Sequence, residues 1–136
     1  MVAAMLPPIR RETHPVLWRR LQEGAVAFDQ RRFWSAHEAW EDGWRGYQGP
    51  DRDYLKGLIQ LAAAGYHLQR GRRSAALAVL ERAPRNLSVA DPSRWPFDCG
   101  HLLTVCAALS QGCRKPQLPA PPRLRLGPML AAADLW

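Results

Sequence analysis

Residues 33–41 read Phe-Trp-Ser-Ala-His-Glu-Ala-Trp-Glu, a stretch that places a histidine and two glutamates among aromatic and small apolar residues. A second stretch, Gly-Leu-Ile-Gln at residues 57–60 followed by His67, places a glutamine and a histidine among apolar residues. In both stretches the apolar residues recur at helical spacing, without the alternation of a strand. The two stretches therefore predict a pair of helices that carry polar groups within an apolar pattern, and they mark the candidate functional centre.

The chain on either side follows the same helical pattern. Thr13 is placed to cap the first helix and Asp98 to cap the last, Pro84 interrupts the fourth, and Gly112 stands just past the end of the fifth. The predicted helices span residues 14–29, a stretch ending at 45, then 51–70, 73–83 and 98–111. No segment requires a strand. The sequence predicts an all-α fold, a compact bundle of about five helices built from helical hairpins.

The length of 136 residues is that of one domain. We predict an N-terminal extension at 1–12, the bundle at 13–115 and a tail at 116–136, which holds five of the 12 prolines. The tail has the apolar residues to dock on the bundle through Leu124, Leu126, Leu130 or Trp136. No window approaches the ~18 apolar residues of a membrane span, and the first residues lack a basic leader. We therefore expect a cytoplasmic protein without a membrane partner.

Three cysteines, Cys99, Cys106 and Cys113, follow one another at intervals of seven. On a helix this spacing separates neighbours by about 10 Å, which is too far for a disulfide or for one metal ion held by all three. We interpret them as small core residues of the fifth helix, in preference to redox groups.

A weak internal repeat supports the hairpin arrangement. Gln30-Arg31, Ser35-Ala36 and Ala39 recur 39 residues later as Gln69-Arg70, Ser74-Ala75 and Ala78. Each copy spans a helix, a tight turn and a second helix. Two such copies are too few for a solenoid, so the repeat indicates bundle geometry.

The order and spacing of these elements resemble a family of small all-helical proteins, domain-of-unknown-function family 309. The resemblance covers about residues 17–110, and Trp40 stands where an aliphatic residue is expected. It implies a compact helical bundle and no established activity. The residues that carry it are Phe33, Ala36-His37-Glu38, Glu41, Trp44, Gly57-Leu58-Ile59-Gln60, Ala62-Ala63, His67 and Arg70-Gly71.

The polar residues of the two central helices form the candidate catalytic cluster. Counting from the turns of an antiparallel pair places His37 and His67 at about the same level, with Glu41 facing two alanines and Gln60 deeper, opposite Trp44. The predicted cluster is His37, Glu38, Glu41 and His67, with Gln60 beside it.

Three interpretations of this cluster stay open. The groups can satisfy one another as a buried hydrogen-bond network, because a buried polar group without a partner costs about 1 to 3 kcal/mol. They can hold a divalent metal through His37, Glu41 and His67, and a metal-bound water would then act in hydrolysis. They can also act as a metal-free acid–base pair. A functional cluster must open to solvent, whereas a structural one would be sealed by Trp40, Trp44 and nearby leucines.

Basic charge provides a second candidate site. The net charge is +7 and comes almost wholly from arginine, which a nucleic-acid partner or GC-rich coding would each explain. With alternating helices, two arginine-rich turns emerge at one end of the bundle, while Asp42, Asp51 and Asp53 gather at the other. Phosphate, nucleotide or nucleic acid could bind at the arginine-rich end, although charged turns are also common as solvated surface. The predicted anion-binding residues are Arg31, Arg32, Arg70, Arg72 and Arg73.

The tryptophans Trp34, Trp40 and Trp44 fall on nearly one stripe of the second helix. Core packing is the favoured interpretation, and a base-stacking or ligand-lining surface is the alternative. An exposed part of this stripe, or the C-terminal tail, could mediate a homo-oligomer. The sequence as a whole predicts a binding or interaction protein with a largely structural cluster. A metal-dependent or acid–base hydrolase and an anion-binding protein are the alternatives.

Overall fold

The computed structural model describes residues 6–115, and every regular element in this range is a helix. This confirms the all-α prediction. The α-helices are α1 (Pro15–Asp29), α2 (Phe33–Gly46), α3 (Asp53–Gln69), α4 (Arg73–Leu87) and α5 (Cys99–Gly112), with a short 3-10 helix η1 (Pro92–Arg94) before α5. No helix in the described range is both long and apolar enough to cross a membrane. The predicted docking of the tail falls outside the described residues.

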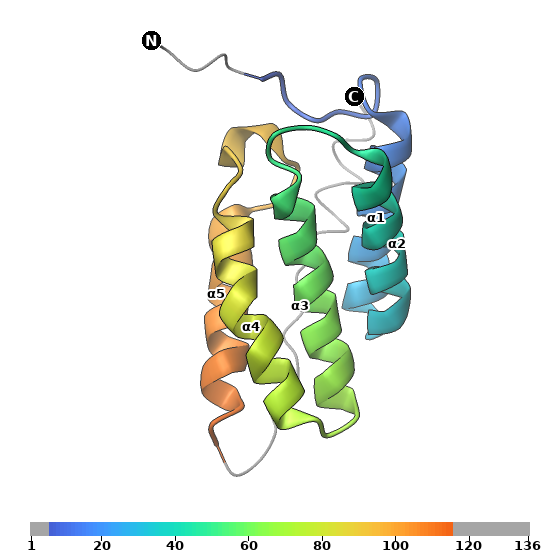
Figure 1. Cartoon of the computed structure of the whole chain (residues 1–136). Helices are drawn as coiled ribbons and strands as arrows, with labels where there is room; N and C mark the ends of the chain where they lie inside the picture. Colours follow the sequence, from blue (N-terminus) through green and yellow to red (C-terminus); the bar gives the residue numbers. More distant parts are fainter. Residues whose placement is uncertain (1–5, 116–136) are drawn as a thin grey trace.

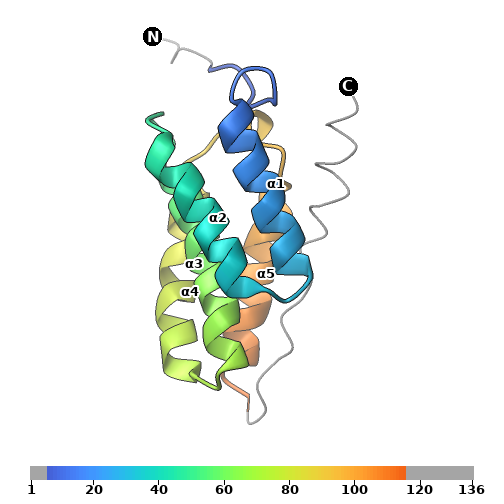
Figure 2. The same cartoon turned by 90° about the vertical axis from the view of Figure 1, so that its right-hand side faces the viewer.

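The bundle consists of two helical hairpins, α1–α2 and α3–α4, with α5 packed against α4 (Figures 1 and 2). Helices α2 and α3 form the contact between the hairpins. The turns α1–α2 and α3–α4 and the end of α5 lie at the lower end of Figure 1, whereas the α2–α3 connection and η1 lie at the upper end. The alternating directions of the helices thus separate the chain connections into two groups.

The two hairpin turns have the same backbone geometry. The amide of Arg32 donates to the carbonyl of Ala27 over 2.8 Å, and the amide of Arg72 donates to that of His67 over 2.8 Å. Arg31 (φ 64°) and Gly71 (φ 70°) hold the left-handed position inside these turns, as in the common motif that ends helices. Arg31 and Gly71 are 40 residues apart, so the structural repeat is 40 residues long. This is one more than the offset of the repeated residues in the sequence.

Close helix packing depends on glycines that face large side chains. A Cβ atom added to Gly57 would lie 2.7 Å from the side chain of Leu87, and one added to Gly65 would lie 2.6 Å from the ring of Phe33. These contacts bring α3 close to α4 and to the start of α2. Glycine at these sites lets the helices approach without losing buried apolar area.

All three cysteines are buried and none forms a disulfide, which confirms the core interpretation. Burial raises the pKa of the Cys106 thiol to about 11. Burial also raises the pKa of Cys99 and Cys113. The thiols are therefore protonated near neutral pH, which makes them poor nucleophiles.

Several predicted helix boundaries were wrong. Thr13 does not cap α1: its hydroxyl accepts from the amide of Arg10 over 3.2 Å, inside the preceding turn. Pro84 does not end α4, which continues to Leu87 because that side chain is buried against α3. Asp98 caps α5 as predicted, by accepting from the amide of His101 over 3.0 Å. At Pro84, the burial of Leu87 outweighed the local tendency of proline to end a helix.

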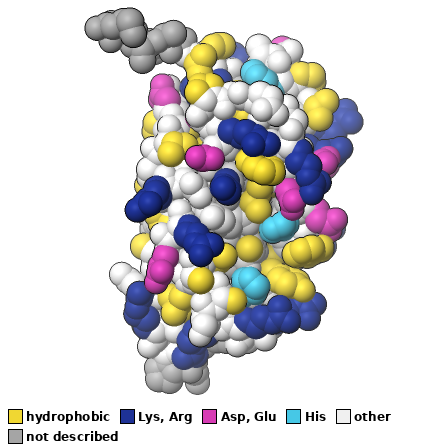
Figure 3. All heavy atoms as spheres, in the orientation of Figure 1, with side chains coloured by type: hydrophobic (Ala, Val, Ile, Leu, Met, Phe, Trp, Pro, Cys, Tyr) yellow, Lys and Arg dark blue, Asp and Glu magenta, His cyan; other side chains and the backbone are white. Residues whose placement is uncertain are grey.

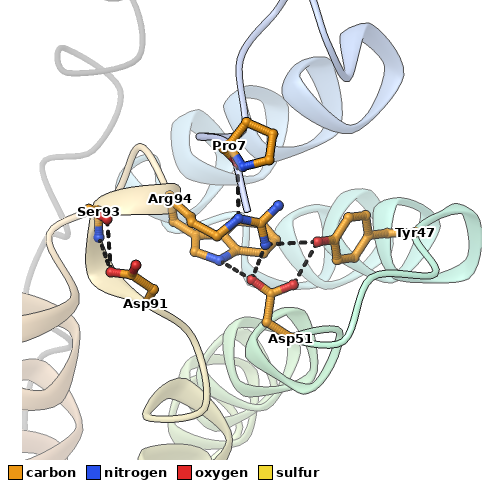
Figure 4. A network of polar contacts seen from close by, with 7 residues as sticks. Pro7, Tyr47, Asp51, Asp91, Ser93 and Arg94 are labelled. Carbon is orange, nitrogen blue, oxygen red and sulfur yellow. Dashed lines mark hydrogen bonds and ion pairs between the residues drawn. The ribbon is translucent and has the colours of Figure 1, made fainter. Parts of the chain in front are cut away.

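A buried polar network joins the upper end of the bundle (Figure 4). Arg94 and Asp51 form an ion pair, and their side chains are only 7% and 8% exposed. The hydroxyl of Tyr47 donates to Asp51 over 2.6 Å, and the indole of Trp95 donates to it over 2.9 Å. We call Tyr47, Asp51, Arg94 and Trp95 the clamp. It joins the α2–α3 connection to η1, so two segments distant in sequence are fixed together.

The clamp also fixes the chain that precedes α1. The guanidinium of Arg94 donates to the carbonyl of Pro7 over 3.0 Å, and the amide of Ile9 donates to the carbonyl of Arg94 over 2.6 Å. The Ile9 side chain is buried. The third helix was predicted to begin at residue 51, which was wrong: α3 begins at Asp53, and Asp51 is buried as the acceptor of the clamp.

Candidate functional site

On the surface of α2, only part of the predicted catalytic cluster comes together. The Nδ1 atom of His37 lies 3.3 Å from a carboxylate oxygen of Glu41, close enough for an ion pair but without hydrogen-bond geometry. Arg45 donates to the other oxygen of Glu41 over 2.7 Å. The indole of Trp34 stacks on the imidazole of His37, with 4.9 Å between ring centroids and 6° between planes. These side chains form one ridge along α2.

Glu38 lines one groove with Glu41, whereas Gln60 lies elsewhere, contrary to prediction. Glu38 is exposed on a shallow groove of about 640 Å³ that Arg20, from α1, also lines. Gln60 faces α4, where it accepts from the amide of Asn86 over 2.8 Å. Counting from the turns set the helix levels incorrectly: Phe33 packs on Gly65 and Trp34 on Tyr66, so His67 lies nearer the turn than His37 does. The count also does not fix how each helix is rotated about its axis.

The described residues do not support the predicted three-residue metal site. Within residues 6–115, no group of three or more His, Cys, Asp or Glu side chains could hold a metal ion. His37 and Glu41 meet, but His67 does not complete a set with them. The residues of this part of the chain thus give a metal-dependent hydrolase no support.

His67 belongs with the arginine-rich turn. Its Nδ1 atom is buried and has no hydrogen-bond partner among the described residues. Burial lowers the pKa of His67, and the nearby charge of Arg72 lowers it further. The imidazole is therefore mainly neutral at pH 7. Its pKa depends on the positive charge at this end of the bundle.

The arginine-rich turns come together as predicted. The side-chain amide of Gln69, from the second hairpin, donates to the carbonyl of Arg31, in the first turn, over 2.8 Å. The end of α5 adds two basic residues that the sequence analysis did not include, and both Arg73 and Arg114 lower the pKa of Cys113, against the larger effect of burial. We call the set Arg31, Arg32, Arg70, Arg72, Arg73, Arg114 and Lys115 the basic end.

Arg31 is the most constrained member of the basic end. It is the one residue other than glycine with positive φ in the described range, at a position where glycine is usual. Its Nη1 atom is buried and has no hydrogen-bond partner among residues 6–115. A strained backbone and an unsatisfied buried donor coincide here, as they do at many binding sites.

Arg31→Gly is expected to stabilise the protein. The left-handed conformation costs a residue with a Cβ atom roughly 1 kcal/mol, and glycine pays little for it. After the greater entropy of the unfolded glycine is counted, we expect the free energy of unfolding to rise by about 0.5 kcal/mol. Urea denaturation measures this change. Gly71→Ala, at the equivalent turn, should lower stability, and a loss of stability in Arg31→Gly would show that Arg31 has a structural role.

The predicted aromatic stripe divides between core and surface. Trp40 is fully buried, as core packing requires, and Trp44 is partly buried beneath the guanidinium of Arg52 at 3.8 Å. Trp34 is 52% exposed, so its assignment to the core was wrong. Tyr66 lies 5.2 Å from Trp34 between ring centroids, and Arg70 lies over the ring of Tyr66. Trp34 therefore flanks the basic end.

Figure 3 displays this face of the molecule. Histidine and hydrophobic side chains lie together where α2 and α3 run side by side, and Lys and Arg side chains lie below them. The fold and this surface define a small helical-bundle protein with a basic end flanked by aromatic rings.

Residues 21–79 match the family model described as Domain of unknown function (DUF309). This match confirms the resemblance to that family drawn from the sequence. The match extends from α1 into α4 and includes the candidate cluster and both arginine-rich turns. None of the curated proteins and none of the solved structures matches the chain.

Proposed function

We propose that the protein binds a phosphate-bearing anion at the basic end. The observation that carries this proposal is the contact between the two turns, in which Gln69 from one hairpin binds the backbone at Arg31 in the other. Guanidinium groups from both turns are thereby held at one end of the bundle. Planar guanidinium groups bind phosphate oxygens through paired hydrogen bonds, so several of them on a fixed frame favour such a ligand.

The state of Arg31 supports the proposal. A bound phosphate would supply an acceptor for its buried Nη1 atom, which has none among the described residues. Glycine would fit the left-handed backbone better, yet this position holds the charged residue. Function at the expense of local stability accounts for both features.

The distribution of charge is also favourable. At the opposite end, the buried carboxylate of Asp51 is neutralised within the clamp by Arg94. Asp42 pairs with Arg20 over 2.8 Å. The basic end carries exposed arginines at positions 32, 70 and 72. A field of one sign at one end attracts and orients an anionic ligand, with a strength that falls as salt rises.

Calorimetric titration with inorganic polyphosphate tests the proposal. We expect affinity to fall as salt rises, and the variant Arg70→Ala/Arg72→Ala to bind about tenfold more weakly at low salt, because each lost ion pair contributes up to about 1 kcal/mol. The matched control Arg82→Ala/Arg85→Ala removes two exposed arginines from α4 and should keep its affinity within about twofold. Equal losses in both variants would reduce the binding to general attraction by net charge.

This proposal gives the protein a binding role, which was the main function predicted from the sequence. It leaves the ridge of His37 and Glu41 outside the anion site. Acid–base catalysis by that pair stays a prediction, as do the cytoplasmic location and the homo-oligomer.

A further inference from the structure

We infer that the ligand of the basic end is a single-stranded nucleic acid, one base of which stacks on the indole of Trp34. This inference rests on the proposed anion site and adds the chemical class of the ligand. The juxtaposition behind it is an exposed, pre-oriented aromatic ring beside a fixed group of arginines.

Trp34 offers a ring face to solvent. It is 52% exposed, and the other exposed large hydrophobic residues of the described range are aliphatic. His37 covers one face of the indole in a nearly parallel stack, with 6° between ring planes. His37 is itself in contact with Glu41, so the imidazole that supports the indole is held in place. A ring held in this way loses little conformational freedom when a base stacks on it.

Trp34 is joined to the basic end through Tyr66. The two rings are 5.2 Å apart between centroids, tilted by 47°, and the guanidinium carbon of Arg70 lies 4.7 Å from the centroid of Tyr66. One tyrosine ring therefore separates the stacking surface from the first cation. A base stacked on Trp34 would leave its phosphate within reach of the basic end. Proteins bind single strands through this combination of aromatic stacking and basic residues.

Acidic residues on the other side of Trp34 determine on which side of the ring the backbone of the strand would lie. Glu38, Glu41 and Asp42 line the groove of about 640 Å³ to which Trp34 also contributes. Arg20 and Arg45 pair with Asp42 and Glu41 in this groove, but Glu23 and Glu38 leave it with more carboxylates than guanidinium groups. The backbone of the strand would therefore lie toward Arg70 and away from the groove. A duplex keeps its bases stacked and inaccessible, whereas a single strand can present an open base to an aromatic side chain.

Two probes of equal charge separate base stacking from phosphate binding. One is an oligothymidylate of about 12 nucleotides, and the other has the same backbone without bases. We expect Trp34→Ala to weaken binding of the oligothymidylate about 5- to 150-fold, the range measured for one base on one aromatic ring. The abasic strand should bind the variant and the wild type equally. Fluorescence anisotropy at low salt measures both affinities.

Trp34→Phe keeps an aromatic ring and should restore part of the affinity for the oligothymidylate. Circular dichroism should show the same helix content in both variants, because Trp34 is exposed. Equal binding of the oligothymidylate to Trp34→Ala and wild type would overturn the base-stacking inference and leave the anion site intact. An equal loss for both strands would also overturn it. Failure of the wild type to bind the abasic strand at low salt would remove the anion site itself, and the inference with it.

Discussion

Asp51→Ala is expected to lower the free energy of unfolding by about 3 to 5 kcal/mol, the range for removing one partner of a buried ion pair. The substitution leaves the charge of Arg94 buried without its carboxylate, and it also removes the acceptor of Tyr47 and Trp95. The hydrogen bond from the Arg94 guanidinium to the carbonyl of Pro7 would be weakened with the clamp. Chemical denaturation followed by circular dichroism measures the change.

Asp53→Ala is the matched control. Asp53 is exposed in the first turn of α3, two residues from Asp51, and its favourable interaction with the helix dipole is worth up to about 1 kcal/mol. We expect a loss within that limit. If the two variants lost equal stability, the clamp would contribute no more than an exposed carboxylate.

Acid should weaken the clamp. Burial alone raises the pKa of Asp51, but hydrogen bonds from Tyr47, Arg94 and Trp95, with the charge of Arg94, lower it overall. A lowered pKa in the folded state means that the unfolded chain binds the proton more readily. The contribution of Asp51 is therefore complete above the pKa of an unfolded aspartate and is lost as pH falls through the lower, folded value. In Asp51→Ala this part of the acid sensitivity should disappear.

Gly24→Ala is the second substitution with a large expected effect. A Cβ atom at Gly24 would overlap the indole of Trp40, which is fully buried and cannot move outward. The indole also donates to the carbonyl of Leu21 over 3.2 Å, a bond that its displacement would break. Overpacking of a core costs about 1 to 3 kcal/mol, and a buried hydrogen bond adds about 1 kcal/mol, so we expect a loss of about 3 kcal/mol.

Gly46→Ala provides the control on a helix position without neighbours. A Cβ atom there would meet nothing within 4 Å, and the residue is exposed at the end of α2. Alanine favours helix over glycine by up to about 1 kcal/mol, so this variant should be unchanged or slightly more stable. Thermal unfolding of both variants measures the difference. A Gly24→Ala protein as stable as Gly46→Ala would show that α1 and α2 are not packed as described.

The sequence was sufficient to predict the helices because their apolar spacing and turn residues are local properties. Asp98 was identified as a cap from its position alone, and the structure has its carboxylate bound to the amide of His101. Pro84 was misread because its effect depends on Leu87, which is buried only after α3 and α4 have packed. The Thr13 cap failed for a local reason, because its hydroxyl accepts from the amide of Arg10 in the preceding turn.

The clamp could not be found from the sequence. Asp51 and Arg94 are 43 residues apart. The sequence analysis placed Asp51 at the start of the third predicted helix and left Arg94 outside the predicted helices. Their pairing depends on how η1 folds back over the α2–α3 connection. No periodic pattern in the sequence predicts that arrangement. Trp95 and Tyr47, both buried, were the available hint, since aromatic residues with polar tips need a partner inside a core.

The candidate site was predicted in part for a similar reason. Counting residues from the turns placed both arginine-rich turns at one end, where the Gln69 contact joins them. The same count says nothing of rotation about a helix axis, so Gln60 was assigned to the wrong neighbour. It also misjudged the levels of α2 and α3, since Trp34 packs on Tyr66, so His67 was assigned to the wrong group. The strained conformation of Arg31 was missed because turn rules lead the reader to glycine, which stands only in the second turn.

Stability and the proposed binding are located at opposite ends of the bundle. The clamp fixes the upper end of Figure 1, and the basic end lies at the lower one. Variants at one end should therefore leave the other nearly unchanged, because distant sites contribute independently to stability. This separation lets binding and folding be measured without confusion between them.

Nuclear magnetic resonance titration of the whole chain with inorganic polyphosphate tests the anion site most directly. We predict that amide shifts concentrate in residues 30–35 and 66–73, and that the pKa of His67, which Arg72 lowers, rises when phosphate offsets that charge. Residues 47–52 and 91–95 of the opposite end should stay unchanged. Shifts spread over the whole surface, or centred on that opposite end with the pKa of His67 unaltered, would contradict the account.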